Sequence, residues 1–201
     1  MRRGIENSTG TRCHLNSALQ AFAASGLSSV GCRPLCGLLV VLRSPGPPVA
    51  VRVGAFAALA RPDVAPDQFF DAAESFLHLL MLSAGGSVAM SAEFSFQTTA
   101  VANGHVQMAI TATAALGVGD SDDISSAIRR SNEILDPGTG EPQGVLRFDS
   151  SPGRALFVQM IRYSPDLAID LASRAVLPGQ EKEFVLVAAI VCTGDWGHYW
   201  V

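Results

Sequence analysis

The chain has 201 residues, 48% of them apolar and 16% charged, which suits a domain with a hydrophobic core and excludes a disordered chain. A formal net charge of −4 gives no electrostatic basis for binding nucleic acid. No signal-peptide pattern follows Met1, and the longest apolar run, residues 184–192, is far shorter than the ~20 residues that span a bilayer. We therefore expect an intracellular protein, cytoplasmic or nuclear, with no membrane partner.

Helical patterns dominate the first part of the chain. Residues 14–24 place their apolar side chains at i, i+3, i+4 and i+7, which is one face of a helix ended by Gly26. Residues 38–42 are typical of a short buried strand or helix segment, and the ambiguous residues 49–60 favour a helix. A further helix is predicted to open at Pro66-Asp67 and to end at Gly85-Gly86.

Strand patterns dominate from about residue 87 onward. An acidic N-cap region, residues 120–123, predicts a helix over residues 124–135. Asn103-Gly104 predicts a turn between two strands. The predicted strands are residues 88–99, 106–115, 145–148, 155–163, 184–192 and 198–201. Residues 184–192 are apolar on both faces and are predicted to be central in a sheet. The order of elements indicates an α+β chain.

Cys13 is the first candidate for chemistry, because it stands where the first helix begins. A helix N-terminus and a nearby imidazole both favour the thiolate, and His198, after a predicted tight turn, is a candidate for that imidazole. Asn7 is a candidate side-chain donor to an oxyanion. From the residues alone, Cys13 is either a nucleophile or a small apolar residue that happens to begin a helix. Cys32 and Cys36 lack a second pair of ligands, so we expect reduced thiols and no metal.

Two segments at opposite ends of the chain resemble the ubiquitin-specific proteases. Residues 4–22, GIENSTGTRCHLNSALQAF, resemble the cysteine box of that family, and residues 184–199, FVLVAAIVCTGDWGHY, resemble its histidine box. The resemblance implies a papain-like cysteine peptidase fold in a single domain. It would have a helical thumb over about residues 1–86, and a β-sheet palm with reduced fingers over about residues 87–201. It also implies Cys13 as nucleophile and His198 as base.

Weaker matches between the two boxes follow the family's order. Residues 71–80, DAAESFLHLL, are similar to a helix of the family's thumb, and residues 124–135 stand where the family has another helix. Residues 157–163, FVQMIRY, are similar to a palm strand. The paired Cys-x-x-Cys motifs of the zinc-bearing fingers are absent, and Asn103-Gly104-His105 occupies that region. The resemblance therefore implies fingers without metal and an enzyme without a cofactor.

The departures from the family pattern gather around the nucleophile. The family's oxyanion Asn lies five residues before the Cys, where this chain has Ser8, so Asn7 and Ser8 are alternatives for that role. Arg12 replaces a Thr and His14 replaces an aromatic residue. Cys192 stands where the histidine box has its first His, which is not catalytic.

The third catalytic member is the other departure. The chain stops three residues after His198, before the segment that supplies an Asp or Asn in the family. Asp195 is the nearest carboxylate and is typical of a turn residue. We expect either a chain truncated at the C-terminus or a Cys-His dyad.

The resemblance implies a thiol-dependent deubiquitinase, a hydrolase that cleaves the isopeptide bond after the C-terminal Gly of ubiquitin or a ubiquitin-like protein. Its partners would be that modifier and its conjugates, and we expect a monomer. Asp67, Asp71 and Glu74 are candidates for meeting arginines of the modifier's tail, or they form a solvated helix face. Two alternatives remain, a catalytically inactive ubiquitin-binding module of the same fold and a papain-like protease that processes a polyprotein.

Overall fold

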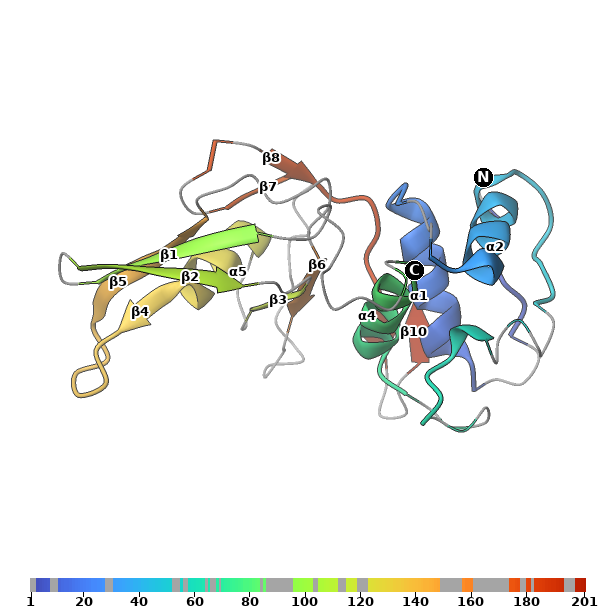
Figure 1. The fold of residues 1–201 in the computed structure, drawn as a ribbon, viewed down its shortest axis with the longest axis horizontal. Helices are drawn as coiled ribbons and strands as arrows, with labels where there is room; N and C mark the ends of the chain where they lie inside the picture. Colours follow the sequence, from blue (N-terminus) through green and yellow to red (C-terminus); the bar gives the residue numbers. More distant parts are fainter. Residues whose placement is uncertain are drawn as a thin grey trace. The chain divides into compact units, whose positions relative to one another are not determined.

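The computed structural model divides the chain into two compact units (Figure 1). Unit 1 comprises Met1–Ala89 and Val187–Val201, and unit 2 comprises Met90–Leu186. The structure describes residues 3–7, 11–27, 31–51, 55, 58–63, 65, 68, 70–83, 85, 96–102, 105–111, 115–118, 123–148, 157–160, 174–177, 180–181, 183–193 and 198–201. The last fifteen residues, expected in the strand-rich lobe, thus belong with the helical unit.

Among the residues of unit 1 that the structure describes, the core includes three helices: α1 (Cys13–Ala24), α2 (Arg33–Arg43) and α4 (Ala72–Ser83). α1 packs against both of the others. Its predicted apolar face is buried, and the Phe22 ring lies 5.7 Å from that of Phe76 on α4, centroid to centroid. The helix predicted over residues 14–24 is confirmed. Residues 38–42 prove to be the second half of α2, which starts earlier because Pro34 stands in its first turn, where proline is tolerated.

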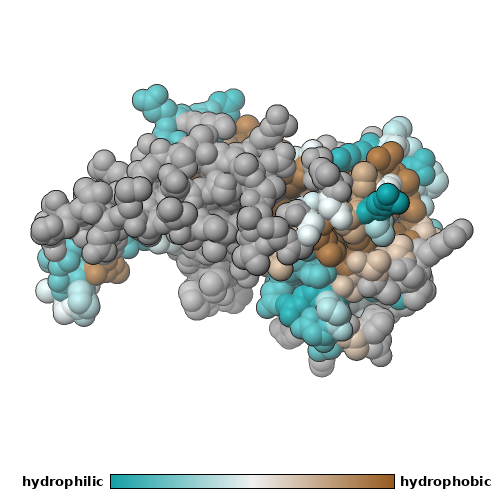
Figure 2. Space-filling view, viewed as in Figure 1, coloured by the Kyte–Doolittle hydropathy of each residue, from teal (hydrophilic) through white to brown (hydrophobic). Residues whose placement is uncertain are grey.

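α2 presents only one face to this core. Leu35, Leu39 and Leu42 are buried, whereas Val40 and Val41 are exposed. In Figure 2 apolar and hydrophilic residues are mixed at the surface in the region that α2 occupies in Figure 1. Arg43, at the end of α2, donates to the carbonyl of Ala23 at 3.1 Å, so the C-terminal ends of α1 and α2 are tied together.

α4 begins later than the sequence predicts. The Asp71 carboxylate accepts from the backbone N–H groups of Ala73 and Glu74, at 2.7 and 3.1 Å, so the helix is capped at Asp71 rather than opened at Pro66-Asp67. The predicted end is correct, because Gly85 has a φ of 76°, a conformation that favours glycine after a helix.

Unit 1 contains short strand pairings from both ends of the chain. Near the front, Val49 forms an isolated parallel bridge with Ile5. At the end, β9 (Val191–Thr193) pairs antiparallel with β10 (His198–Trp200), the predicted return strand. β10 lies against α1. The N-terminal helix and the C-terminal strand are therefore neighbours within one compact unit.

Unit 2 contains a four-stranded antiparallel sheet in the order β2-β1-β5-β4. The strands are β1 (Phe96–Ala102), β2 (His105–Thr111), β4 (Glu133–Leu135) and β5 (Pro142–Phe148). Ala102 pairs with His105, as expected for a hairpin at Asn103-Gly104, although those two residues lie outside the described ones. β3 (Ala115–Val118) pairs in parallel with β6 (Phe157–Met160), and β7 (Arg174–Val176) pairs antiparallel with β8 (Glu183–Val185).

α5 (Ile124–Ser131) packs against β3 and β7. Its buried residues form a cluster with Leu177, against which Val158, Ala175 and Phe184 pack. Asp123 caps the helix, as the acidic region predicts. The predicted end at residue 135 is wrong, because residues 133–135 form β4 and pair with β5.

The single strand predicted over residues 184–192 is also wrong. β8 ends at Val185 and β9 begins at Val191, so the run contributes to two different sheets in two different units. Val185 is 63% exposed and Val187 is 61% exposed. An apolar run indicates that burial is favourable, but it does not specify a pairing partner, which comes from distant parts of the chain.

Candidate active site

Cys13 is the first residue of α1, and its side chain is 6% exposed. No side chain caps this helix among the residues that the structure describes, and no acidic residue stands in its first turn. The partial positive charge of the helix N-terminus therefore meets no carboxylate from its own first turn. The sequence predicted that Cys13 would stand at the start of a helix. It left open whether Cys13 is a nucleophile or a small packed residue, and the near-complete burial of the thiol fits the second interpretation.

Asn7 lies next to the start of α1. The backbone that leads to it is held by Val49, whose N–H donates to Gly4 at 2.9 Å and whose carbonyl accepts from Glu6 at 3.0 Å. The Asn7 side-chain oxygen accepts a long hydrogen bond, 3.4 Å, from the backbone N–H of Arg12. The carboxamide is thus held one residue away from Cys13. Ser8, its alternative as oxyanion donor, lies outside the described residues.

His198 is the first residue of β10, and its backbone is opposite Thr193. Because β10 contacts α1, the strand that begins at His198 lies beside the helix that begins at Cys13. The side chain of His198 lies outside the described part of the chain, and so does Asp195. The structure therefore brings together the two elements that carry the predicted pair.

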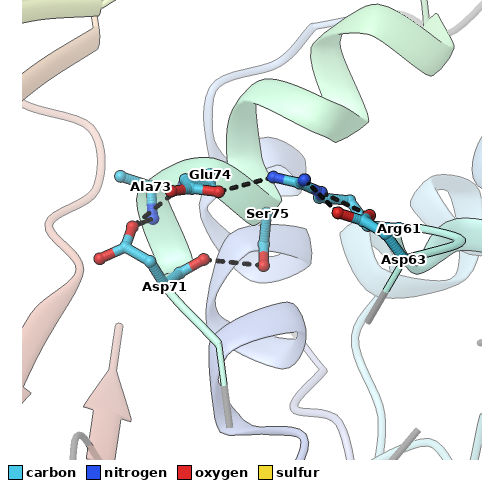
Figure 3. Close-up of polar contacts among 6 residues, drawn as sticks. All are labelled: Arg61, Asp63, Asp71, Ala73, Glu74 and Ser75. Carbon is cyan, nitrogen blue, oxygen red and sulfur yellow. Dashed lines mark hydrogen bonds and ion pairs between the residues drawn. The ribbon is translucent and has the colours of Figure 1, made fainter. Parts of the chain in front are cut away.

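The Asp71 carboxylate lies beside α1 and β10. The sequence suggested only surface roles for it. Tyr199, on β10, has its hydroxyl 3.4 Å from Asp71 Oδ2. The other Asp71 oxygen caps α4, as Figure 3 shows. The Tyr199–Asp71 contact was missed by sequence reasoning, and no local signal could have found it, because the partners are 128 residues apart.

His14 follows the candidate nucleophile and is 8% exposed. Burial lowers the pKa of His14, while the Thr11 backbone and the Asp71 carboxylate raise it in part. Its ring meets the ring of Phe70 edge-on, with centroids 6.1 Å apart. The imidazole is therefore a packed, neutral-favouring group that replaces the aromatic residue expected at this position.

The remaining acidic side chain of the α4 face is paired within the protein. Arg61 donates to Glu74 at 2.6 Å and, through Nε, to Asp63 at 2.9 Å (Figure 3). The guanidinium also lies 4.9 Å from the centroid of the Phe70 ring. Arg61 therefore already occupies the position of a cation at Glu74, and an arginine of a bound tail would have to displace it. Asp67 lies outside the described residues.

No disulfide joins any of the four cysteines, and Cys36 and Cys192 are exposed. Among the described residues, no three His, Cys, Asp or Glu side chains gather in a way that could hold a metal ion. Of the helices that the structure describes, none combines the length and the apolarity needed to cross a bilayer.

A comparison with models of protein families finds no match, and a comparison with curated proteins finds none either.

Proposed function

We propose that this chain is a thiol-dependent deubiquitinase of the ubiquitin-specific protease type, an intracellular peptidase with a papain-like fold. The observation that carries the proposal is the contact between α1, which begins at Cys13, and β10, which begins at His198. These segments stand at opposite ends of the sequence, and a Cys-His mechanism requires the segments that carry its two residues to be neighbours.

The proposed reaction uses the groups at the start of α1 and β10. His198 takes the proton of the Cys13 thiol, and the thiolate attacks the carbonyl carbon of the modifier's C-terminal Gly. Backbone N–H groups at the start of α1, together with Asn7, stabilise the oxyanion. His198 then protonates the leaving lysine amine, and water hydrolyses the thioester. No metal or cofactor takes part in this scheme.

The observation that favours a second candidate is the burial of Cys13, which is only 6% exposed. A thiol closed off from solvent cannot reach a substrate carbonyl unless the surrounding groups move. The second candidate is therefore a catalytically inactive module that binds ubiquitin, or a ubiquitin-like protein, without cleaving it.

A ubiquitin derivative with a C-terminal electrophile separates the two candidates. The enzyme is expected to form a covalent adduct that disappears in Cys13→Ala and persists in Cys36→Ser, a matched change at an exposed thiol on α2. His198→Ala is expected to slow adduct formation by about a hundredfold or more. Binding of ubiquitin without an adduct would support the inactive module, and an adduct in Cys13→Ala would refute the proposed mechanism.

A further inference from the structure

The sequence neighbours of Cys13 and of His198 converge on one carboxylate, that of Asp71. On one side, the Tyr199 hydroxyl donates to Asp71 Oδ2. On the other side, His14 packs against Phe70, and burial lowers the pKa of His14 while the negative charge of Asp71 offsets part of that lowering. Asp71 therefore lies between α1, which begins at the proposed nucleophile, and β10, which begins at the proposed base.

The two carboxylate oxygens of Asp71 have different hydrogen-bond partners. Oδ1 accepts from the N–H groups of Ala73 and Glu74 and so fixes the carboxylate at the start of α4 (Figure 3). Oδ2 faces Tyr199. Because α4 packs against α1, a carboxylate held by α4 is also held relative to α1. A side chain with a single oxygen, such as serine, can cap the helix but cannot also reach Tyr199.

The Tyr199 hydroxyl keeps the proton that it donates in this contact. Burial and the neighbouring Asp71 and Cys192 raise the pKa of Tyr199 to about 12, so the phenol keeps its proton at neutral pH. Cys192 lies opposite Tyr199 in the β9–β10 pair. The hydroxyl is half-buried, and it connects a strand of only three residues to the helical core.

We propose that Asp71 is a positioning residue for the Cys13–His198 pair. By accepting the hydrogen bond of Tyr199, it fixes the position of β10 against α1. The inference rests on the proposed function in taking Cys13 and His198 as the reacting pair. It does not require ubiquitin to be the substrate. It assigns Asp71 an internal role in place of contact with arginines of the modifier's tail.

Two substitutions remove the Tyr199–Asp71 bond from opposite sides. Asp71→Ser keeps an N-cap for α4 and removes the second oxygen, whereas Tyr199→Phe removes only the donor hydroxyl. Asp123→Ser is the matched control, because it makes the same cap exchange at α5 in unit 2. The full-length chain is treated with iodoacetamide from pH 5 to pH 10, and alkylation of Cys13 is measured by peptide mapping.

The alkylation rate of Cys13 is compared between the unaltered chain and the variants at each pH. Each single variant is expected to slow alkylation at pH 7 about tenfold. The double variant is expected to be within about twofold of either single variant, since both remove one bond. Asp123→Ser is expected to leave the profile unchanged. With a ubiquitin substrate, kcat should fall while KM changes less than about twofold.

Unchanged profiles in both single variants would overturn the positioning role, and so would effects that multiply in the double variant. If Asp71→Ser fails to fold, as judged by circular dichroism, Tyr199→Phe decides alone, because it removes no cap. A chain that ignores the ubiquitin electrophile but alkylates Cys13 at a rate that depends on Asp71 would end the deubiquitinase proposal and keep the positioning role.

Discussion

The helices α1 and α5 begin in different ways. α5 follows Asp123, an extended residue with φ −140° and ψ 156°, whose side chain accepts from the Ser126 N–H at 2.8 Å. α1 follows Arg12, with φ −95° and ψ 12°, and no side-chain cap is found for it among the described residues. One helix therefore has a carboxylate at its positive end, and the other has the proposed nucleophile there.

The two helices are also stabilised differently. Ten of the twelve residues of α1 are buried, whereas α5 buries three of eight. α1 is therefore held mainly by packing, which allows its N-terminus to go without a capping carboxylate. α5 depends more on its cap and on Arg129 and Arg130 in its last turn, which complement the helix dipole. Packing, in this comparison, is what allows a helix start to be used for chemistry.

The largest expected effect is the loss of the packing that holds α1. Phe22 is fully buried, and Phe22→Ala is expected to lower the free energy of unfolding of unit 1 by about 3–5 kcal/mol. Urea denaturation followed by circular dichroism measures the change. Val40→Ala, at an exposed position of α2, is the control and should change stability by less than about 0.5 kcal/mol. An equally small loss for Phe22→Ala would mean that packing does not stabilise α1.

The two helix starts are expected to respond to acid in different pH windows. The pKa of His14 is lowered by burial in the folded chain, so below its ordinary value of 6.5 the unfolded chain binds more protons. Stability due to His14 is thus present above pH 6.5 and is lost as pH falls, by at most about 1.4 kcal/mol per pH unit. His78, whose pKa is lowered first by burial and then by Arg61, adds a loss of the same sign.

Asp123 acts with the same sign in a more acidic window. Its hydrogen bonds with Ser126 lower the pKa of Asp123, so its contribution is present above the ordinary value of 3.8 and is lost only in stronger acid. Denaturation at a series of pH values measures both windows. His14→Phe should flatten the loss near pH 6, and Asp123→Ser should leave that loss in place. A slope near pH 6 that is unaltered in His14→Phe would contradict the assignment.

An acidic residue at the start of α1, like Asp123 at the start of α5, is expected to slow the reaction of Cys13. Arg12→Asp places a negative charge beside Cys13, which raises the pKa of a thiol and should lower adduct formation with a ubiquitin electrophile at pH 7 by about threefold to tenfold. Arg33→Asp makes the same change at the start of α2 and should have no such effect. Equal slowing in both variants would point to the net charge of the chain rather than to the start of α1.

The smallest expected effect is the loss of the α5 cap itself. Asp123→Ala removes the acceptor for Ser126 and is expected to lower the Tm of unit 2 by about 2–4 °C, as measured by thermal circular dichroism. Asp123→Ser should restore most of that difference. Full stability in Asp123→Ala would show that α5, like α1, is held by packing.

Local patterns predicted the helices better than their limits. The i, i+3, i+4 and i+7 spacing of residues 14–24 predicted α1 because its one-sided apolar pattern matches the period of a helix. The start of α4 was predicted several residues early, because capping by Asp71 depends on where its side chain points. The C-terminal part of the helix predicted over residues 124–135 became β4, because β5 offered it a partner.

The candidate site divides in the same way. The sequence predicted Cys13 at a helix start and His198 at the start of a strand, and both positions are found. It could not predict that Cys13 would be buried. Nor could it predict that Tyr199 would donate a hydrogen bond to Asp71, or that Arg61 would donate one to Glu74. Each of these depends on contacts between segments that are far apart in the sequence or on packing around them.

By itself, the sequence determined the α+β composition, the helix that begins at Cys13 and the hairpin pairing of β1 with β2, since these follow from spacing and turn chemistry within short segments. Only the tertiary structure decided that the apolar run of residues 184–192 serves two sheets, and that the last strand lies against the first helix. The physical reason is that a strand's hydrogen bonds must be completed by another segment, and the sequence of a strand does not name that segment.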